Sequence, residues 1–265
     1  MNKNCFTFKN EYSFDDLLSI LQILRAPGGC PWDREQTHST IRNSFIEEVY
    51  EAVDTIDNND MPGLCEELGD VLLQVVFHAQ LAEQAGAFNI NQVCDGICKK
   101  LIYRHPHVFS DIKVNTSDEV LDNWDKLKQK EKHQENFSDT LKSVPKAFPA
   151  LMRAQKVQKR AAKAGFDWDD YTGPISKIFE ETEELKEAIN SASNIEEEFG
   201  DLIFSVVNLS RFLKLDAEQV LSAATDKFIS RFKMVEDEVE KSGRRMDEVS
   251  PAELDSIWDS VKLSL

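Results

Sequence analysis

Pairs of carboxylates three positions apart recur along this chain, and their spacing is suited to binding a hard metal ion. The pairs are Glu48 with Glu51, Glu67 with Asp70, Glu181 with Glu184, and Glu198 with Asp201. Residues at this spacing share one face of an α-helix. If the two helices that carry the pairs in each half of the chain pack antiparallel, four carboxylates converge, and they repel one another unless a cation lies between them. Oxygen ligands in this number suit Mg²⁺ or Mn²⁺ better than zinc.

The same spacing has a plainer interpretation, because acidic residues at positions i and i+3 usually mark a solvated helix face. In this chain, however, an ExxE pair is followed by an ExxD pair beside an apolar run, and the whole arrangement occurs twice. This recurrence favours a metal site. One more acidic residue precedes each ExxE pair, Glu47 in the first half and Glu180 in the second, and either could orient or deprotonate a water molecule.

Two pairs of basic residues, each one helical turn apart, are candidate contacts for phosphate oxygens. Lys100 precedes Arg104, and Lys227 precedes Arg231. Taken alone, such residues are more often surface charges. Beside a metal–carboxylate site, they would be suitable partners for phosphate, which arginine can bind in bidentate fashion.

Two tryptophans, Trp32 and Trp168, lie in predicted loops before the acidic helices. Either could stack on a nucleobase, and either could equally close the end of a hydrophobic core. His105 and His107 flank a proline and indicate a structural turn, whereas His78 follows an apolar run and is predicted to be a hydrogen-bonded core histidine.

The elements that position these residues are arranged as a tandem repeat. Residues 67–76 reappear as residues 198–207, with a glutamate, a glycine, an aspartate and two valines in register, and four other landmarks recur in the same order. The sequence therefore predicts a first unit over residues 1–112, a polar linker with one helix over 113–148, and a second unit over 149–265.

Both units are predicted to be helical bundles, because apolar residues recur at helical spacing and no stretch alternates with a period of two. The stripe in the first acidic helix consists of Ile46, Val49, Val53 and Ile56. Gly69 and Gly200 lie inside acidic helices, where glycine costs about 1 kcal/mol relative to alanine. Their recurrence indicates a close approach by a neighbouring helix or by a ligand, and Gly165 is predicted to end a helix at Ala164.

Composition limits the partners and the compartment. The 265 residues are 41% hydrophobic, enough to form a core, and the net charge of −17 argues against general nucleic-acid binding. The five cysteines are an odd number without a CxxC pair, which indicates reduced thiols and a cytoplasmic protein, and Cys94 and Cys98 are predicted to be buried small hydrophobes. Neither a signal peptide nor a membrane span is expected.

Taken together, these residues resemble the MazG family of nucleoside triphosphate pyrophosphohydrolases in its long tandem form. The segments that carry the resemblance are residues 29–37 (GCPWDREQT), 47–51 (EEVYE), 67–70 (ELGD), 104–109 (RHPHVF), 149–156 (PALMRAQK), 165–168 (GFDW) and 198–201 (EFGD). They follow one another in order along nearly the whole chain, so the resemblance is specific.

The resemblance implies an all-α fold, with two MazG-like helical bundle units in tandem and a homodimer that completes the bundles. It implies Mg²⁺-dependent hydrolysis of nucleoside and deoxynucleoside triphosphates to the monophosphate and pyrophosphate. Carried over position by position, the paired carboxylates look like metal ligands, and the two basic pairs look like triphosphate contacts. The second unit is implied to do most of the catalysis, although both units keep all four carboxylates and both basic residues.

Two other classes of protein are alternatives. A ferritin-like di-iron protein needs Glu-x-x-His on two helices, whereas this chain has one such motif, from Glu35 to His38. A non-enzymatic binding protein would use the acidic clusters as docking faces. The intact carboxylates and basic residues of both units disfavour this second alternative, which binding unaffected by Mg²⁺ would support.

Overall fold

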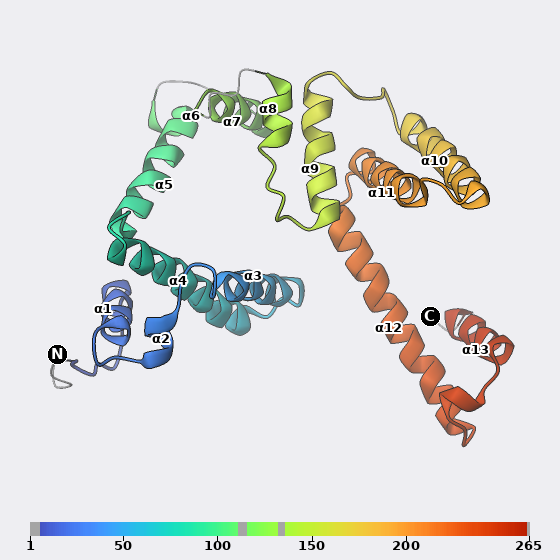
Figure 1. The fold of residues 1–265 in the computed structure, drawn as a ribbon, viewed down its shortest axis with the longest axis horizontal. Coiled ribbons are helices and arrows are strands. Elements are labelled where there is room, and N and C mark those ends of the chain that lie inside the picture. Colours follow the sequence, from blue (N-terminus) through green and yellow to red (C-terminus); the bar gives the residue numbers. More distant parts are fainter. Residues whose placement is uncertain (1–5, 111–115, 132–135, 264–265) are drawn as a thin grey trace. The chain divides into compact units, whose positions relative to one another are not determined.

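The computed structural model describes residues 6–110, 116–131 and 136–263, and every regular element in these ranges is a helix (Figure 1). The prediction of an all-α fold is confirmed. The chain divides into two compact units, Met1–Lys128 and Gln129–Leu265. Among the described residues, no helix is both long enough and apolar enough to cross a membrane.

The first unit is built around a helical hairpin. Its helices are α1 (Phe14–Arg25), α2 (Pro31–Glu35), α3 (Arg42–Asp57), α4 (Met61–Gln84), α5 (Ile90–Arg104), α6 (Pro106–Phe109) and α7 (Ser117–Glu131), the last of which continues past the unit boundary. Helices α3 and α4 pack along each other. Asn59 makes the turn between them with a left-handed φ of 56°, and the Asp60 side chain caps α4 by accepting a hydrogen bond from the Gly63 N–H.

Helix α1 packs on α4 and supplies part of the core of the first unit. The buried cluster joins α1, the segment before α3, and α4; its members are Leu21, Ile41, Val76, Phe77 and Leu81. These apolar contacts bury residues in the second half of α4. The first half of α4 is left to carry polar side chains.

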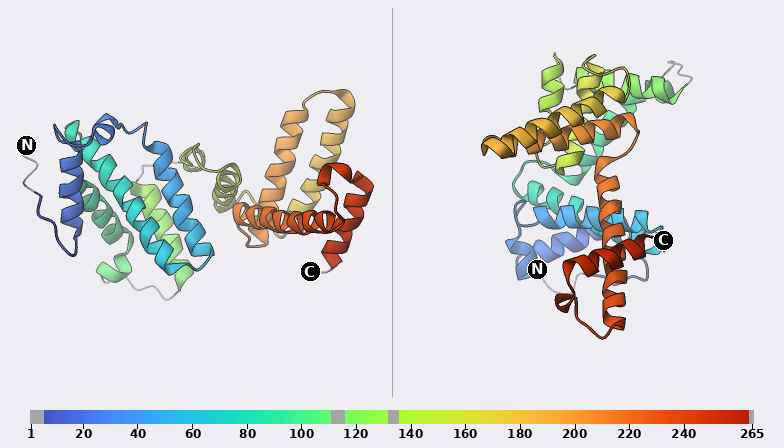
Figure 2. Two further views of the ribbon diagram at one scale, coloured as in Figure 1. Left: turned by 90° about the horizontal axis from the view of Figure 1, so that it is seen from below. Right: turned by 90° about the vertical axis from the view of Figure 1, so that its right-hand side faces the viewer.

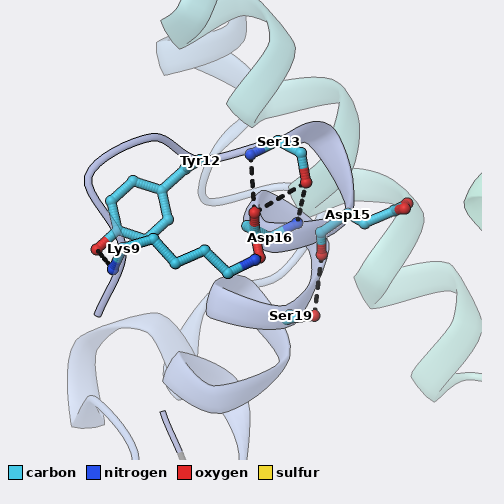
Figure 3. Close-up of polar contacts among 6 residues, drawn as sticks. All are labelled: Lys9, Tyr12, Ser13, Asp15, Asp16 and Ser19. Carbon is cyan, nitrogen blue, oxygen red and sulfur yellow. Dashed lines mark hydrogen bonds and ion pairs between the residues drawn. The ribbon is translucent and has the colours of Figure 1, made fainter. Parts of the chain in front are cut away.

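The start of α1 is fixed by a capping box, shown in Figure 3. Ser13 and Asp16 exchange hydrogen bonds between side chain and backbone, and the Lys9 ammonium lies 2.6 Å from an Asp16 oxygen. The hydrogen bonds from Lys9 and Ser13 lower the pKa of Asp16 to about 2. Asp16 is therefore ionised at neutral pH and favourably placed at the positive end of the helix.

The second unit repeats the hairpin. Its helices are α8 (Phe137–Lys142), α9 (Ala150–Lys163), α10 (Thr172–Ser191), α11 (Ile195–Phe212), α12 (Ala217–Lys241), the 3₁₀ turn η1 (Met246–Glu248) and α13 (Pro251–Leu263). Helices α10 and α11 pack along each other, and α13 packs against α12 (Figure 2). Ala192 and Asn194 make the turn of the hairpin with φ of 53° and 58°.

Helix α9 is joined to α11 by packing and by a buried amide. The Gln158 Nε2 donates to the Phe204 carbonyl over 2.7 Å. Helix α9 ends at Lys163 with Ala164 as its C-cap, and Gly165 follows with φ of 85°, as the sequence predicts. Helix α8, from the predicted linker, packs on α9, so this part of 113–148 belongs to the second unit.

Some expectations about packing are wrong. Cys94 and Cys98 are exposed on α5 rather than buried. A Cβ atom added at Gly69 or at Gly200 would meet nothing within 4 Å, so no neighbouring helix of this structure approaches either glycine closely, and the approach of a ligand stays a prediction. The apolar stripe of α3 is also open to solvent, with Ile56 52% exposed. The stripe of α3 lies on the same hairpin as the paired carboxylates of the first unit.

Candidate functional site

Three carboxylates of the first unit converge across the α3–α4 hairpin. Glu48 on α3 and Glu67 and Asp70 on α4 each place one oxygen so that the three oxygens lie within 4.8 Å of one another. All three residues are half-buried. The convergence expected from the i, i+3 spacing is thus realised by three of the four paired residues.

The second unit forms the same group on its own hairpin. Glu181 on α10 and Glu198 and Asp201 on α11 bring their oxygens within the same 4.8 Å limit. Glu181 is 4% exposed, and its Oε2 has no hydrogen-bond partner among the described residues. A buried carboxylate oxygen without a partner is costly, and a bound cation would satisfy it.

The electrostatics of the two groups favour a cation as well. Burial, followed by the negative charge of Asp70, raises the pKa of Glu48. Burial and then the charge of Glu51 raise the pKa of Glu67. In the second unit, burial and then the charge of Glu181 raise the pKa of Glu184. Both groups contain only carboxylate ligands, without histidine or cysteine, which is the donor set that hard divalent cations prefer.

The remaining predicted carboxylates surround these groups. Glu51 and Glu184 lie outside the two groups of three but act on them through their charge. Glu47 contributes to the raised pKa of Glu48. Glu180 is held by the ammonium of Lys177, 2.6 Å from its Oε1.

Two residues beside the carboxylates were not singled out from the sequence. Lys177 also contacts Glu181, with 2.7 Å between the ammonium and Oε1. Gln74 is buried on α4, and its Nε2 lies 3.5 Å from an oxygen of Glu48. Both could have been found, because Lys177 lies four positions before Glu181 and Gln74 lies four positions after Asp70, on the carboxylate face of each helix.

The basic pairs differ between the units. Lys100 and Arg104 lie on α5; Arg104 is buried, and its guanidinium lies 5.4 Å from the centre of the Trp124 ring. Lys227 and Arg231 lie on α12, where Lys227 is exposed and Arg231 is half-buried with Nε unpartnered among the described atoms. The arginine of the first unit is therefore stacked on a tryptophan in the interior of its unit.

The two loop tryptophans also differ. Trp32 lies on the short helix α2 and is 63% exposed, so it does not close a core within this structure. Trp168 is 45% exposed and lies against the start of α10, because a Cβ atom added at Gly173 would lie too close to its ring. His78 is half-buried and does have a hydrogen-bond partner, as expected: its Nδ1 lies 2.8 Å from Nδ1 of His38.

Comparison with known proteins assigns the chain to a family. Residues 36–109 and 172–236 both match the MazG nucleotide pyrophosphohydrolase domain, and these ranges contain both carboxylate groups. The nucleoside triphosphate pyrophosphohydrolase/pyrophosphatase MazG of Thermotoga maritima is 46% identical over 249 residues, which cover 94% of this chain and 95% of the relative. The nucleoside triphosphate pyrophosphohydrolase of Escherichia coli K12 is 44% identical over 253 residues, which cover 94% and 96%. With two copies of the domain and relatives that match almost from end to end, this chain belongs to the MazG family of nucleotide pyrophosphohydrolases.

Proposed function

We propose that the protein hydrolyses nucleoside and deoxynucleoside triphosphates to the monophosphate and pyrophosphate, with Mg²⁺ held by its carboxylate groups. The observation that carries the proposal is the buried Oε2 of Glu181, which has no partner among the described residues and belongs to a group of three converging carboxylates. Membership of the MazG family and relatives named as nucleoside triphosphate pyrophosphohydrolases support the reaction.

In the second unit, the carboxylate group is the cation site. Glu181, Glu198 and Asp201, with Glu184 beside them, hold the cation. When bound, Mg²⁺ supplies Lewis acidity toward phosphate oxygens and makes nearby water more acidic. Mn²⁺ has similar ligand preferences and is expected to substitute for it.

Proton transfer and charge stabilisation come from other side chains of the second unit. An oxygen of Glu180 accepts the proton of the attacking water while the bond between the monophosphate and the pyrophosphate breaks. Lys227 and Arg231 bind the oxygens of the departing pyrophosphate, where negative charge develops. Trp168 stacks on the nucleobase. No covalent intermediate on the protein is required.

We propose that the second unit carries most of the turnover. In the first unit, Glu48, Glu51, Glu67 and Asp70 serve as metal ligands, Glu47 takes the place of Glu180, and Lys100, Arg104 and Trp32 are the corresponding contacts. Arg104, however, is buried against Trp124, whereas Arg231 is half-buried and its Nε has no partner among the described atoms. Arg231 thus keeps a donor that a phosphate oxygen could accept from.

We further propose that the protein is a homodimer in which a second copy covers the open faces of the hairpins. The stripe of α3 is exposed, and on α10 and α11 Phe179 and Phe199 are 69% and 55% exposed. Large contiguous apolar faces of this kind mark interaction sites on soluble proteins. The open space at Gly69 and Gly200 leaves room for a helix of the partner.

We place the enzyme in the cytoplasm and exclude nucleic acid as a partner. The thiols of Cys30, Cys65, Cys94 and Cys98 are free, as expected in a reducing compartment. The net charge of −17 opposes binding to a polyanion.

The test is incubation of the purified protein with a panel of NTPs and dNTPs, with Mg²⁺ and then with EDTA, with all nucleotide products resolved. We expect monophosphate and pyrophosphate with Mg²⁺ and no turnover with EDTA. Diphosphate and orthophosphate would identify a different phosphohydrolase. Absence of turnover across the panel would favour a binding protein.

A further inference from the structure

The two carboxylate groups differ in one positive charge. In the second unit, the Lys177 ammonium lies 2.6 Å from Oε1 of Glu180 and 2.7 Å from Oε1 of Glu181. Lys177 comes from the same helix as both glutamates, so the two ion pairs require no contact between helices. One of the three converging carboxylates is thereby already paired with a cation that belongs to the chain.

The first unit has no such charge at the corresponding position. Aligning the Glu47–Glu48 pair with Glu180–Glu181 places Ser44 where the second unit has Lys177. The side chain that reaches Glu48 is instead the neutral amide of Gln74, at 3.5 Å. Gln74 Oε1 is also buried and unpartnered among the described atoms, so the amide beside this group carries an unsatisfied oxygen.

This difference has a direct consequence for a divalent cation. A cation entering the first group meets carboxylates and a neutral amide. A cation entering the second group must displace the Lys177 ammonium from Glu181 or bind beside it, and two positive charges a few ångströms apart repel even at a protein surface. The partly buried setting, with Glu181 4% exposed, reduces screening by salt.

We propose that Lys177 makes the two groups unequal, so that in the absence of substrate the first group binds a divalent cation and the second keeps Lys177 as the counter-charge of Glu181. The second group then takes up its cation together with the triphosphate, whose negative charge offsets the ammonium. This inference rests on the proposed function, because it takes both groups as cation sites. In the first unit the cation is bound with or without substrate. In the second unit the cation binds tightly only together with the substrate.

The experiment is a titration of the full-length protein with Mn²⁺, in which free Mn²⁺ is followed by electron paramagnetic resonance without nucleotide. For the wild type we expect one tight site per chain and a second site at least about tenfold weaker. Asp70→Asn should remove the tight site, and Asp201→Asn should remove the weak one. A non-hydrolysable triphosphate analogue should strengthen the weak site by about tenfold or more.

Reciprocal variants test the role of Lys177. Lys177→Gln keeps a hydrogen-bond donor for Glu181 but removes the charge, and it should strengthen the weak site toward the tight one. Ser44→Lys places an ammonium one turn before Glu48 and should weaken the tight site. Lys186→Gln, on the same helix but paired with the exposed Glu183, is the matched control and should change neither. Circular dichroism checks that each variant is folded.

The outcomes separate the inference from the function. Two equal Mn²⁺ sites in the wild type, or a weak site unchanged by Lys177→Gln, would overturn the inference even if the enzyme turns over triphosphates normally. An analogue that leaves the weak site unchanged would overturn the coupling to substrate. Mn²⁺ binding unaffected by both Asp70→Asn and Asp201→Asn would remove the cation sites themselves and, with them, the proposed mechanism.

Discussion

At the scale of single residues, the proposed chemistry depends on carboxylates that would be unfavourable without a partner. Glu48, Glu67 and Glu184 all have raised pKa values, first because of burial and then because of neighbouring negative charge. Such groups destabilise the fold when they ionise, and a divalent cation reverses that effect. The cost is therefore an indication of function, in agreement with the rule that perturbed groups gather at active sites.

The first prediction concerns Asp201, one of the three converging residues of the second unit. Asp201→Asn keeps the size of the side chain but removes one charge from the cation site, so kcat/KM for a triphosphate should fall by about 10²–10³-fold, the range expected for loss of one stabilising group. Steady-state kinetics at saturating Mg²⁺ measure the effect. Glu183→Gln, on the exposed side of α10, should leave the activity unchanged. Full activity of Asp201→Asn would contradict the assignment of the second site.

The second prediction uses His78, whose pKa is lowered by burial and by the positive charge of His38. The unfolded chain therefore binds a proton at His78 more readily than the folded one. Stability should be fully present above pH 6.5, the ordinary value, and should be lost as the pH falls from there through the lowered pKa. Urea unfolding at a series of pH values measures this loss. His78→Leu introduces the residue that the second unit has at the repeated position, Leu209. This variant should not lose stability over the same pH range, and a pH profile identical to that of the wild type would contradict the prediction.

At the scale of elements, the hairpins are fixed by their turns and by what packs against their ends. The Trp168 ring lies close to Gly173: a Cβ atom added at Gly173 would be 2.3 Å from the nearest atom of the ring. Glycine in the first turn of α10 thus makes room for the tryptophan that we place over the nucleobase. Gly96, in the middle of α5, has open space around its Cβ position.

These two glycines give the third prediction. Gly173→Ala should displace Trp168 and destabilise the fold by about 1–3 kcal/mol, the usual cost of overpacking. Gly96→Ala should stabilise it by roughly 0.5–1 kcal/mol, because alanine is favoured over glycine inside a helix. Denaturant unfolding measures both changes, and a shift in tryptophan fluorescence should accompany the first alone. Equal effects of the two changes would show that Trp168 does not pack as described.

At the scale of the whole molecule, each hairpin leaves large apolar side chains exposed, which is the basis of the homodimer that we propose. The stripe of α3 and the aromatic residues of α10 and α11 are exposed although they are large and apolar. A second hairpin covering this face would further limit the access of water to the half-buried carboxylates of the hairpin. Assembly and catalysis are therefore expected to depend on each other.

The fourth prediction tests this dependence with a charge on the open face. Val53→Glu, at a position 42% exposed on α3, should shift the protein from dimer to monomer. Sedimentation velocity at several concentrations measures the change, with Gln22→Glu on the exposed side of α1 as the control. A wild type that is monomeric at micromolar concentration would contradict the proposed homodimer, and a dimer that tolerates Val53→Glu would place the interface elsewhere.

The helical fold and the faces on which the carboxylates lie could be predicted from local spacing along a helix with 3.6 residues per turn. The tandem repeat could be predicted because its landmarks recur in the sequence itself. The stop of α9 before Gly165 could also be predicted, because glycine adopts the left-handed φ of a helix end at little cost. The contact of Lys177 with Glu181 also follows from local spacing, because the two residues lie four positions apart on one helix. Tertiary packing brings Glu48 together with Glu67 and Asp70 and leaves Glu51 outside that group, because the register between the two helices depends on how the hairpin packs. It also decided that Cys94 and Cys98 face solvent, since burial depends on which neighbours cover a helix and not on the helix alone.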